Sequence, residues 1–226
     1  MDDLSEEPVF QQVTPPSVSD DSGVAGEPAL ADSAVAADAR AARQDWLVRQ
    51  WTESRGGMRI SLFAGLCAVS GLFAVACALL KNSFGGSLFA VILGAPLVEE
   101  LGKVAAPLMV LEKKPWSFGS ASSIVFIGLV SGLVFASIEN LLYFFVYIEQ
   151  EELTSGVILW RLIVCTALHV LCAAISSSGL ARAWTKASRT KGTFALNAVV
   201  PYFIVAMVLH GVYNLCTVLY AFLQGE

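Results

Sequence analysis

The chain has 226 residues, of which 56% are hydrophobic, and its mean hydropathy is +0.66. This composition is too apolar for a water-soluble domain, so the sequence predicts an all-α, polytopic integral membrane protein. The net charge of −5 is unevenly distributed, because residues 1–45 carry ten acidic and two basic side chains while the remainder has a net charge of +3. Nothing in this distribution resembles a basic nucleic-acid-binding surface, and no nucleic acid is expected as a partner.

The first 59 residues differ in composition from the rest of the chain. Residues 1–45 are rich in Ala, Ser, Asp, Glu and Pro and almost lack aromatic side chains, so they are predicted to be a disordered acidic tail. Residues 46–59 interleave Trp and aliphatic side chains with Arg49 and Arg55, which suits a short amphipathic helix at the membrane surface. A plain juxtamembrane linker is the alternative for this segment. The transmembrane domain is expected to cover residues 60–226.

About five transmembrane helices are predicted, because each spanning helix needs roughly 20 predominantly apolar residues. The expected segments are residues 60–80, 88–111, 118–147, 157–180 and 195–223. Basic residues precede the first segment and follow the second and the fourth, whereas the opposite loops contain only Lys81, Arg161 and the acidic run at 149–152. By the positive-inside rule, the N-terminus is cytoplasmic and the C-terminus lies outside. In the third segment, Gly128, Gly132 and Ala136 form a small-residue stripe that favours close approach of another helix.

Four of these segments contain ionisable or amide side chains, which are expensive in a bilayer and therefore mark a candidate functional site. The second segment contains Glu99, Glu100 and Lys103, with Lys103 at i+4 and i+3 from the two carboxylates. The others contain Glu139 and Asn140 in the third, His169 in the fourth, and His210 and Asn214 in the fifth. At 1.5 Å per residue, four of these side chains lie roughly 14–20 Å from the outer ends of their helices. They are Glu99, Glu139, His169 and His210. We therefore expect them to meet in one polar layer.

These residues resemble the motifs of the PrsW family of polytopic intramembrane proteases, relatives of the CAAX-prenyl endopeptidase and bacteriocin-processing group. That family carries E-E-x-x-K, then F-x-x-x-E-N, then two separate histidines, of which the last is followed four residues later by Asn or Asp. The corresponding residues here are Glu99, Glu100, Lys103, Phe135, Glu139, Asn140, His169, His210 and Asn214, all in this order and within residues 88–216. Lys103 and Glu139 favour the PrsW branch, because the related enzymes have another basic residue and a histidine at these two places.

The resemblance implies hydrolysis of a peptide bond in a membrane-anchored protein, such as a single-span regulator of the anti-sigma-factor type, in a bacterial cytoplasmic membrane. Glu99 or Glu100 would act as the general base on water. Glu139 and His169 would hold the water or a metal, and His210 with Asn214 would donate to the developing oxyanion. Alternatively, Glu139, His169 and His210 form a two-His, one-carboxylate set for zinc or another divalent metal. The short H-E-x-x-H motif is absent, so a metal-free glutamate mechanism stays open.

Two other classes of protein fit the same residue types. A transporter or proton relay would use the Glu and His side chains for ion movement, and Gly94-Ala95-Pro96 would then break the second helix just before Glu99. A non-catalytic membrane scaffold or substrate-binding chaperone would keep the fold without chemistry. Substitution of Glu99 or Glu100 by Gln separates a protease from both alternatives, because only a protease would lose cleavage of a reconstituted substrate.

Overall fold

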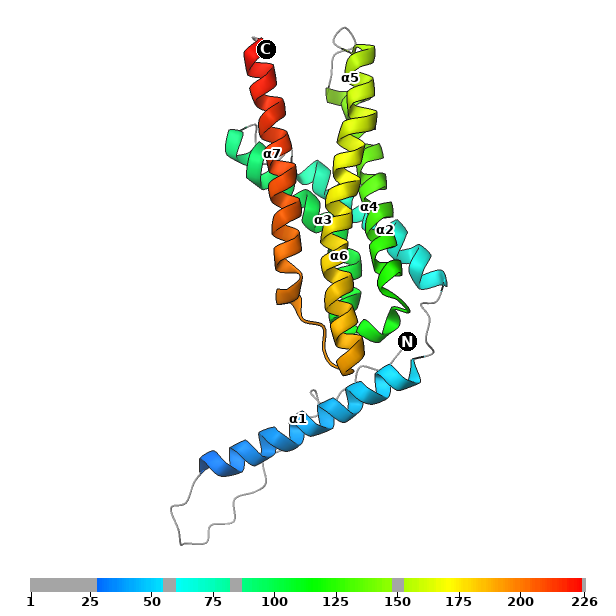
Figure 1. Ribbon diagram of the computed structural model, residues 1–226, viewed down its shortest axis with the longest axis vertical. Coiled ribbons are helices and arrows are strands. Elements are labelled where there is room, and N and C mark those ends of the chain that lie inside the picture. Colours follow the sequence, from blue (N-terminus) through cyan, green and yellow to red (C-terminus); the bar gives the residue numbers. More distant parts are fainter. Residues whose placement is uncertain (1–27, 55–59, 82–86, 148–152, 225–226) are drawn as a thin grey trace. The chain divides into compact units, whose positions relative to one another are not determined.

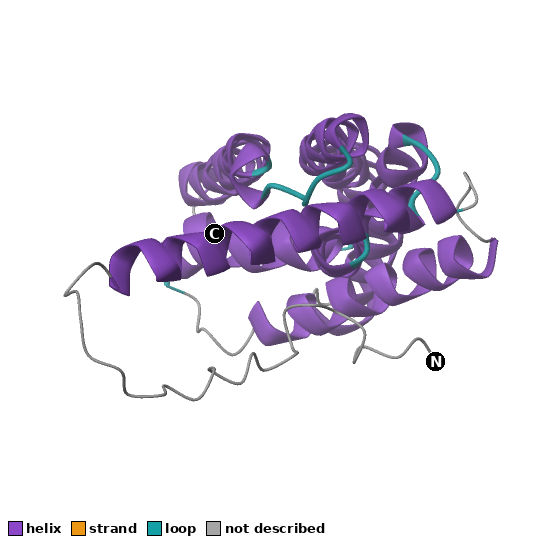
Figure 2. Ribbon diagram, turned by 90° about the horizontal axis from the view of Figure 1, so that it is seen from below, coloured by secondary structure: helices purple, strands orange, loops and turns teal. Residues whose placement is uncertain are grey.

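A computed structural model describes residues 28–54, 60–81, 87–147 and 153–224. The predicted disorder of residues 1–27 and the acidic run at 149–152 fall outside these residues. Helices joined by short turns make up the described part of the chain, and no strand occurs in it, as Figure 2 shows. The all-α prediction is therefore confirmed. The chain divides into two compact units, Met1–Arg55 and Gly56–Glu226.

The first unit contains one long helix, α1 (Pro28–Glu53). This helix covers residues 28–45, which were expected to be disordered, and continues into the segment expected to be amphipathic. The structure thus has a helix where a disordered tail was predicted. Their many alanines explain the difference, because alanine has the highest helix propensity and needs no buried face to form a helix.

The second unit contains five continuous helical stretches at the positions of the five predicted segments. They are α2 (Ile60–Lys81), η3 with α3 (Ala90–Gly94 and Ala95–Lys113), α4 with η5 (Ala121–Leu142 and Tyr143–Tyr147), α5 with η6 and α6 (Ser155–Trp160, Arg161–Cys165 and Thr166–Thr190), and α7 (Val200–Gln224). Two short 3₁₀ turns, η4 (Pro115–Ser117) and η7 (Leu196–Ala198), precede α4 and α7. The fourth stretch extends to Thr190 instead of 180, because Ala, Arg and Lys beyond the apolar run also favour helix.

Three helices among the described residues are long and apolar enough to cross a membrane: Ala121–Tyr147, Ser155–Thr190 and Val200–Leu223. A shorter apolar helix covers Ile60–Phe73. In the second stretch, the apolar sequence is interrupted by Glu99, Glu100 and Lys103, which are residues of the candidate functional site. The protein is thus an integral membrane protein with several candidate spans.

Within this unit, α3 contacts α2, α4, α6 and α7, so the helix with the charged side chains has neighbours on several sides. Figure 1 shows α4, α6 and α7 running side by side, and α4 and α6 share the most extensive interface. The small-residue stripe lies in that interface, because a Cβ on Gly128 would collide with Ser177 and one on Gly132 would lie 2.9 Å from the His169 carbonyl oxygen. The predicted close helix approach is confirmed, and it brings the backbone of His169 against α4.

Three π-helical turns interrupt the regular helices next to the polar layer. They are η3 before Glu99, η5 after Glu139 and η6 before His169. A π turn closes i→i+5 hydrogen bonds and therefore holds one residue more than an α turn, which rotates the side chains on one side of it relative to those on the other. The expected helix break at Gly94–Pro96 is absent, since η3 continues directly into α3. The feature that favoured a transporter is thus not present.

Candidate functional site

The centre of the site is formed by α3, which buries three of its charged residues in the protein. Glu99, Glu100 and Lys103 have exposed fractions of 1%, 0% and 0%. The Lys103 Nζ donates to Glu100 Oε1 over 2.6 Å, one helical turn away. This ion pair makes burial of both charges tolerable, because an unpaired charge in such a position would be strongly destabilising.

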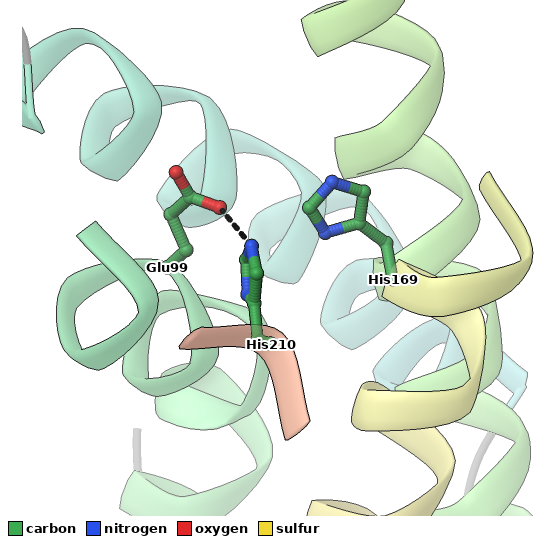
Figure 3. Close-up of side chains that lie close together, drawn as sticks. All are labelled: Glu99, His169 and His210. Atoms are coloured by element: carbon green, nitrogen blue, oxygen red, sulfur yellow. Dashed lines mark ion pairs between the residues drawn. The ribbon is translucent and has the colours of Figure 1, made fainter. Parts of the chain in front are cut away.

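His210 on α7 lies against both carboxylates. Its Nδ1 is 2.8 Å from Glu100 Oε1, and its Nε2 is 3.6 Å from Glu99 Oε2, the contact drawn in Figure 3. Since Glu100 is paired with the Lys103 ammonium as a carboxylate, it accepts, and Nδ1 of His210 carries the proton. The other ring nitrogen, Nε2, faces Glu99.

His169 on α6 is held between a cation and an anion. Its Nδ1 lies 2.9 Å from Lys103 Nζ, and its Nε2 lies 2.8 Å from Glu139 Oε2 on α4. An ammonium group can only donate and a carboxylate can only accept, so Nδ1 accepts from Lys103 and Nε2–H donates to Glu139. The ring is therefore neutral, with a defined tautomer.

Contacts between rings, and between Lys103 and a ring, also position Lys103, His169 and His210. The Phe135 ring on α4 lies 4.8 Å from the His169 ring, and Lys103 Nζ lies 4.6 Å from the Phe135 centroid. The His169 and His210 rings are 4.9 Å apart and nearly perpendicular. The predicted meeting of Glu99, His169 and His210 in one layer is thus confirmed at the level of side-chain contacts.

Glu99, His169 and His210 together could hold a metal ion, because one ligand atom from each lies within 4.8 Å of the others and all three residues are buried. The carboxylate of this group is Glu99, whereas the predicted ligand set contained Glu139. Glu139 instead contacts Arg161 and Nε2 of His169, while Nδ1 of the same ring contacts Lys103. The donor chemistry fits a divalent metal. Each imidazole donates one N–H to a carboxylate, His169 to Glu139 and His210 to Glu100, which is the arrangement typical of metal-binding histidines.

The two asparagines of the motifs connect helices instead of facing the ligand group. Asn140 Nδ2 donates to Thr166 Oγ1 over 3.1 Å, which joins α4 to the beginning of α6. Asn214 Nδ2 donates to the Val91 carbonyl over 2.9 Å, within the π turn η3. One of the two N–H donors of Asn214 is thus used by the backbone, and its predicted role as a donor to an oxyanion stays a prediction. One turn earlier, a Cβ on Gly211 would lie 2.5 Å from the Ile92 carbonyl oxygen, so α7 and η3 are in direct backbone contact.

The sequence analysis missed Arg161 as a residue of the site and counted it only as a charge of the outer loops. Its side chain is only 11% exposed, and Nη2 lies 3.3 Å from Glu139 Oε2. A signal was present in the sequence, because Arg161 lies inside an apolar run, eight residues before His169. With it, the buried layer contains three carboxyl groups and two basic side chains besides the two imidazoles.

Comparison with protein families agrees with this geometry. The model of the PrsW family intramembrane metalloproteases matches residues 56–225, which includes all the site residues described above. The comparisons with curated proteins and with solved structures return no match. The buried glutamate and two histidines are the ligand types of a metallopeptidase, and the matched region covers most of the chain. The chain belongs to the PrsW family of intramembrane metalloproteases and is a peptidase.

Proposed function

We propose that the protein hydrolyses a peptide bond of a membrane-anchored protein, such as a single-span regulator of the anti-sigma-factor type, in a bacterial cytoplasmic membrane. The observation that carries the proposal is the buried group of Glu99, His169 and His210, with ligand atoms within 4.8 Å of one another. It supports metal-assisted hydrolysis, because two imidazoles and one carboxylate leave an open position for water on zinc or another divalent ion.

These three residues would hold the metal, which when bound would activate water and polarise the scissile carbonyl. His169 would bind through Nδ1, where the Lys103 ammonium now donates, so the lysine has to leave that contact when a metal ion is present. His210 would bind through Nε2, which lies 3.6 Å from Glu99 Oε2.

Glu100 and Glu139 would orient the two imidazoles through their outer nitrogens, as carboxylates commonly do for metal-bound histidine. Glu100 has a further role in the proposal. Its Oε2 is buried and has no hydrogen-bond partner among the described residues, while its Oε1 accepts from both Lys103 and His210. A buried carboxylate oxygen without a hydrogen-bond partner is suited to accept a proton from water, so Glu100 would be the general base.

The topology belongs to the proposal as well. The five helical stretches from α2 to α7 would each cross the bilayer, and the charges of Lys113, Lys114, Lys186 and Arg189 favour a cytoplasmic N-terminus and an external C-terminus. The polar layer would then lie closer to the outer face. Water would reach it by a short path from that side.

The test is cleavage of a single-span reporter protein in proteoliposomes containing the purified full chain. The wild type is compared with Glu99→Gln, Glu100→Gln and His210→Gln, and with Glu112→Gln as a matched control, since Glu112 is an exposed carboxylate on the same helix. We expect the control to cleave like the wild type and each site variant to lose at least about 100-fold in rate.

A second arm tests the substrate class with the same reporter segment released from its membrane anchor. The proposal predicts that the anchored reporter is cleaved much faster, because the site is buried in the spanning helices. Unchanged cleavage by Glu99→Gln and His210→Gln would overturn the metal-assisted mechanism. Equal cleavage of the anchored and the released reporter would overturn the proposed substrate class.

A further inference from the structure

Arg161 lies at the first position of the π turn η6 and makes two contacts with α4 and η5. Its Nη2 is 3.3 Å from Glu139 Oε2, and the guanidinium carbon lies 3.3 Å from the centroid of the Tyr143 ring. The same Glu139 oxygen accepts from His169 Nε2 over 2.8 Å. One carboxylate oxygen is thus shared by a cation and by the imidazole proposed as a metal ligand.

The π turn explains how Arg161 reaches this oxygen. In a regular α-helix of 3.6 residues per turn, two residues eight positions apart differ by about 80° in direction. The extra residue of η6 makes the separation equivalent to seven positions, and the difference falls to about 20°. Arg161 and His169 therefore lie on the same face, about two turns apart, and both can contact Glu139.

The backbone of Arg161 is also fixed in this position. Its carbonyl accepts from the side chains of Asn140 over 3.4 Å and of Thr166 over 3.3 Å. Asn140 follows Glu139 directly, so consecutive residues of α4 bind the side chain and the carbonyl of Arg161. Such double attachment positions the guanidinium more strongly than a surface ion pair would.

We propose that Arg161 is a positioning residue that acts through Glu139 to hold the His169 ring, with its proton on Nε2 and its Nδ1 lone pair available to the metal. This inference rests on the proposed metal site. Arg161 holds the Glu139 carboxylate in place, and Glu139 Oε2 in turn accepts a hydrogen bond from Nε2–H of His169. Without the guanidinium, the carboxylate loses the contact with Arg161, and His169 is held less firmly.

The test measures zinc affinity of the purified full chain in detergent by competition with a chromogenic chelator, and the absorption spectrum of the Co²⁺-loaded protein. The variants are Arg161→Gln and Arg161→Lys. The matched control is Arg182→Gln, because Arg182 is on the same continuous helix and its Nη1 donates to the Tyr202 hydroxyl over 3.3 Å. Changes to the outer partners of metal-bound histidine typically weaken metal binding 10- to 100-fold. We expect a loss of this size for Arg161→Gln, a smaller loss for Arg161→Lys, and no change for the control.

A double-mutant cycle with Glu139→Gln tests whether Arg161 acts through the carboxylate. If it does, Arg161→Gln adds no further loss of zinc affinity to Glu139→Gln, and both variants change the Co²⁺ spectrum in the same way. Zinc affinity of Arg161→Gln within twofold of the wild type, or losses that multiply in the double variant, would overturn the inference alone. A wild type that binds no zinc would overturn the proposed metal site together with it.

Discussion

Replacement of Glu100 by Gln removes the negative charge between Lys103 and His210 and changes the side-chain volume very little. Both members of the Lys103–Glu100 pair are fully buried, with Nζ and Oε1 2.6 Å apart. At an effective dielectric constant of about 20, two unit charges at this distance attract each other by about 6 kcal/mol before desolvation is counted. Measured losses on removing one partner of a buried pair are about 3–5 kcal/mol, so we expect the free energy of unfolding to fall by that amount.

The assay is SDS-induced unfolding of the purified protein in mixed micelles, with Glu112→Gln as the control on the exposed face of α3. Lys103→Met should be similarly destabilising, because it leaves Glu100 without its cation. The double variant Glu100→Gln/Lys103→Met should be more stable than either single variant, since it leaves no uncompensated charge of this pair. Equal unfolding free energies for Glu100→Gln and Glu112→Gln would refute this reasoning.

Three further predictions concern the neighbouring contacts and the metal. Gly211→Ala should lower stability by about 1–3 kcal/mol and slow cleavage, because its Cβ would lie 2.5 Å from the Ile92 carbonyl oxygen. The control is Gly65→Ala, whose Cβ would have no atom within 4 Å and which should be neutral or stabilising in the same unfolding assay. Asn214→Ala should cost about 1–3 kcal/mol by leaving the Val91 carbonyl without its donor, with a similar loss in Asn214→Leu, and an unchanged unfolding midpoint would contradict that role. Removal of divalent metal by a chelator should abolish cleavage and lower the melting temperature of the wild type, and re-addition of zinc should restore both; a chelated sample that retains full activity would contradict the metal site.

Much of the fold follows from the sequence, because the length of the apolar segments directly reflects the cost of burying polar groups in lipid. All five predicted segments are helical, and the Gly128 and Gly132 stripe lies in the α4–α6 interface. The helix at residues 28–45 was not predicted, because this segment combines an acidic composition, which favours disorder, with many alanines, which favour helix. The π turns were not predictable either, because an apolar run looks the same whether or not one turn contains an extra residue.

The members of the site could be predicted from their cost in the membrane, but their contacts could not. Spacing placed Glu99 and Glu100 on one helix and left open which of them lies beside both imidazoles. The rotation of α3 about its axis decides which carboxylate faces the imidazoles. This rotation depends on the π turn η3, whose presence and position cannot be predicted from the sequence. The same applies to Glu139, which contacts the outer nitrogen of His169, and to Arg161, which only the extra residue of η6 brings to that carboxylate.

The central claim is that Glu99, His169 and His210 form one metal site, and the most direct test is the metal content of purified protein. Elemental analysis of the wild type should find about one divalent ion per chain. The variants Glu99→Gln, His169→Gln and His210→Gln should each contain far less metal, while Glu112→Gln retains it. Full metal content in Glu99→Gln and both histidine variants, or an active wild type without bound metal, would contradict the account.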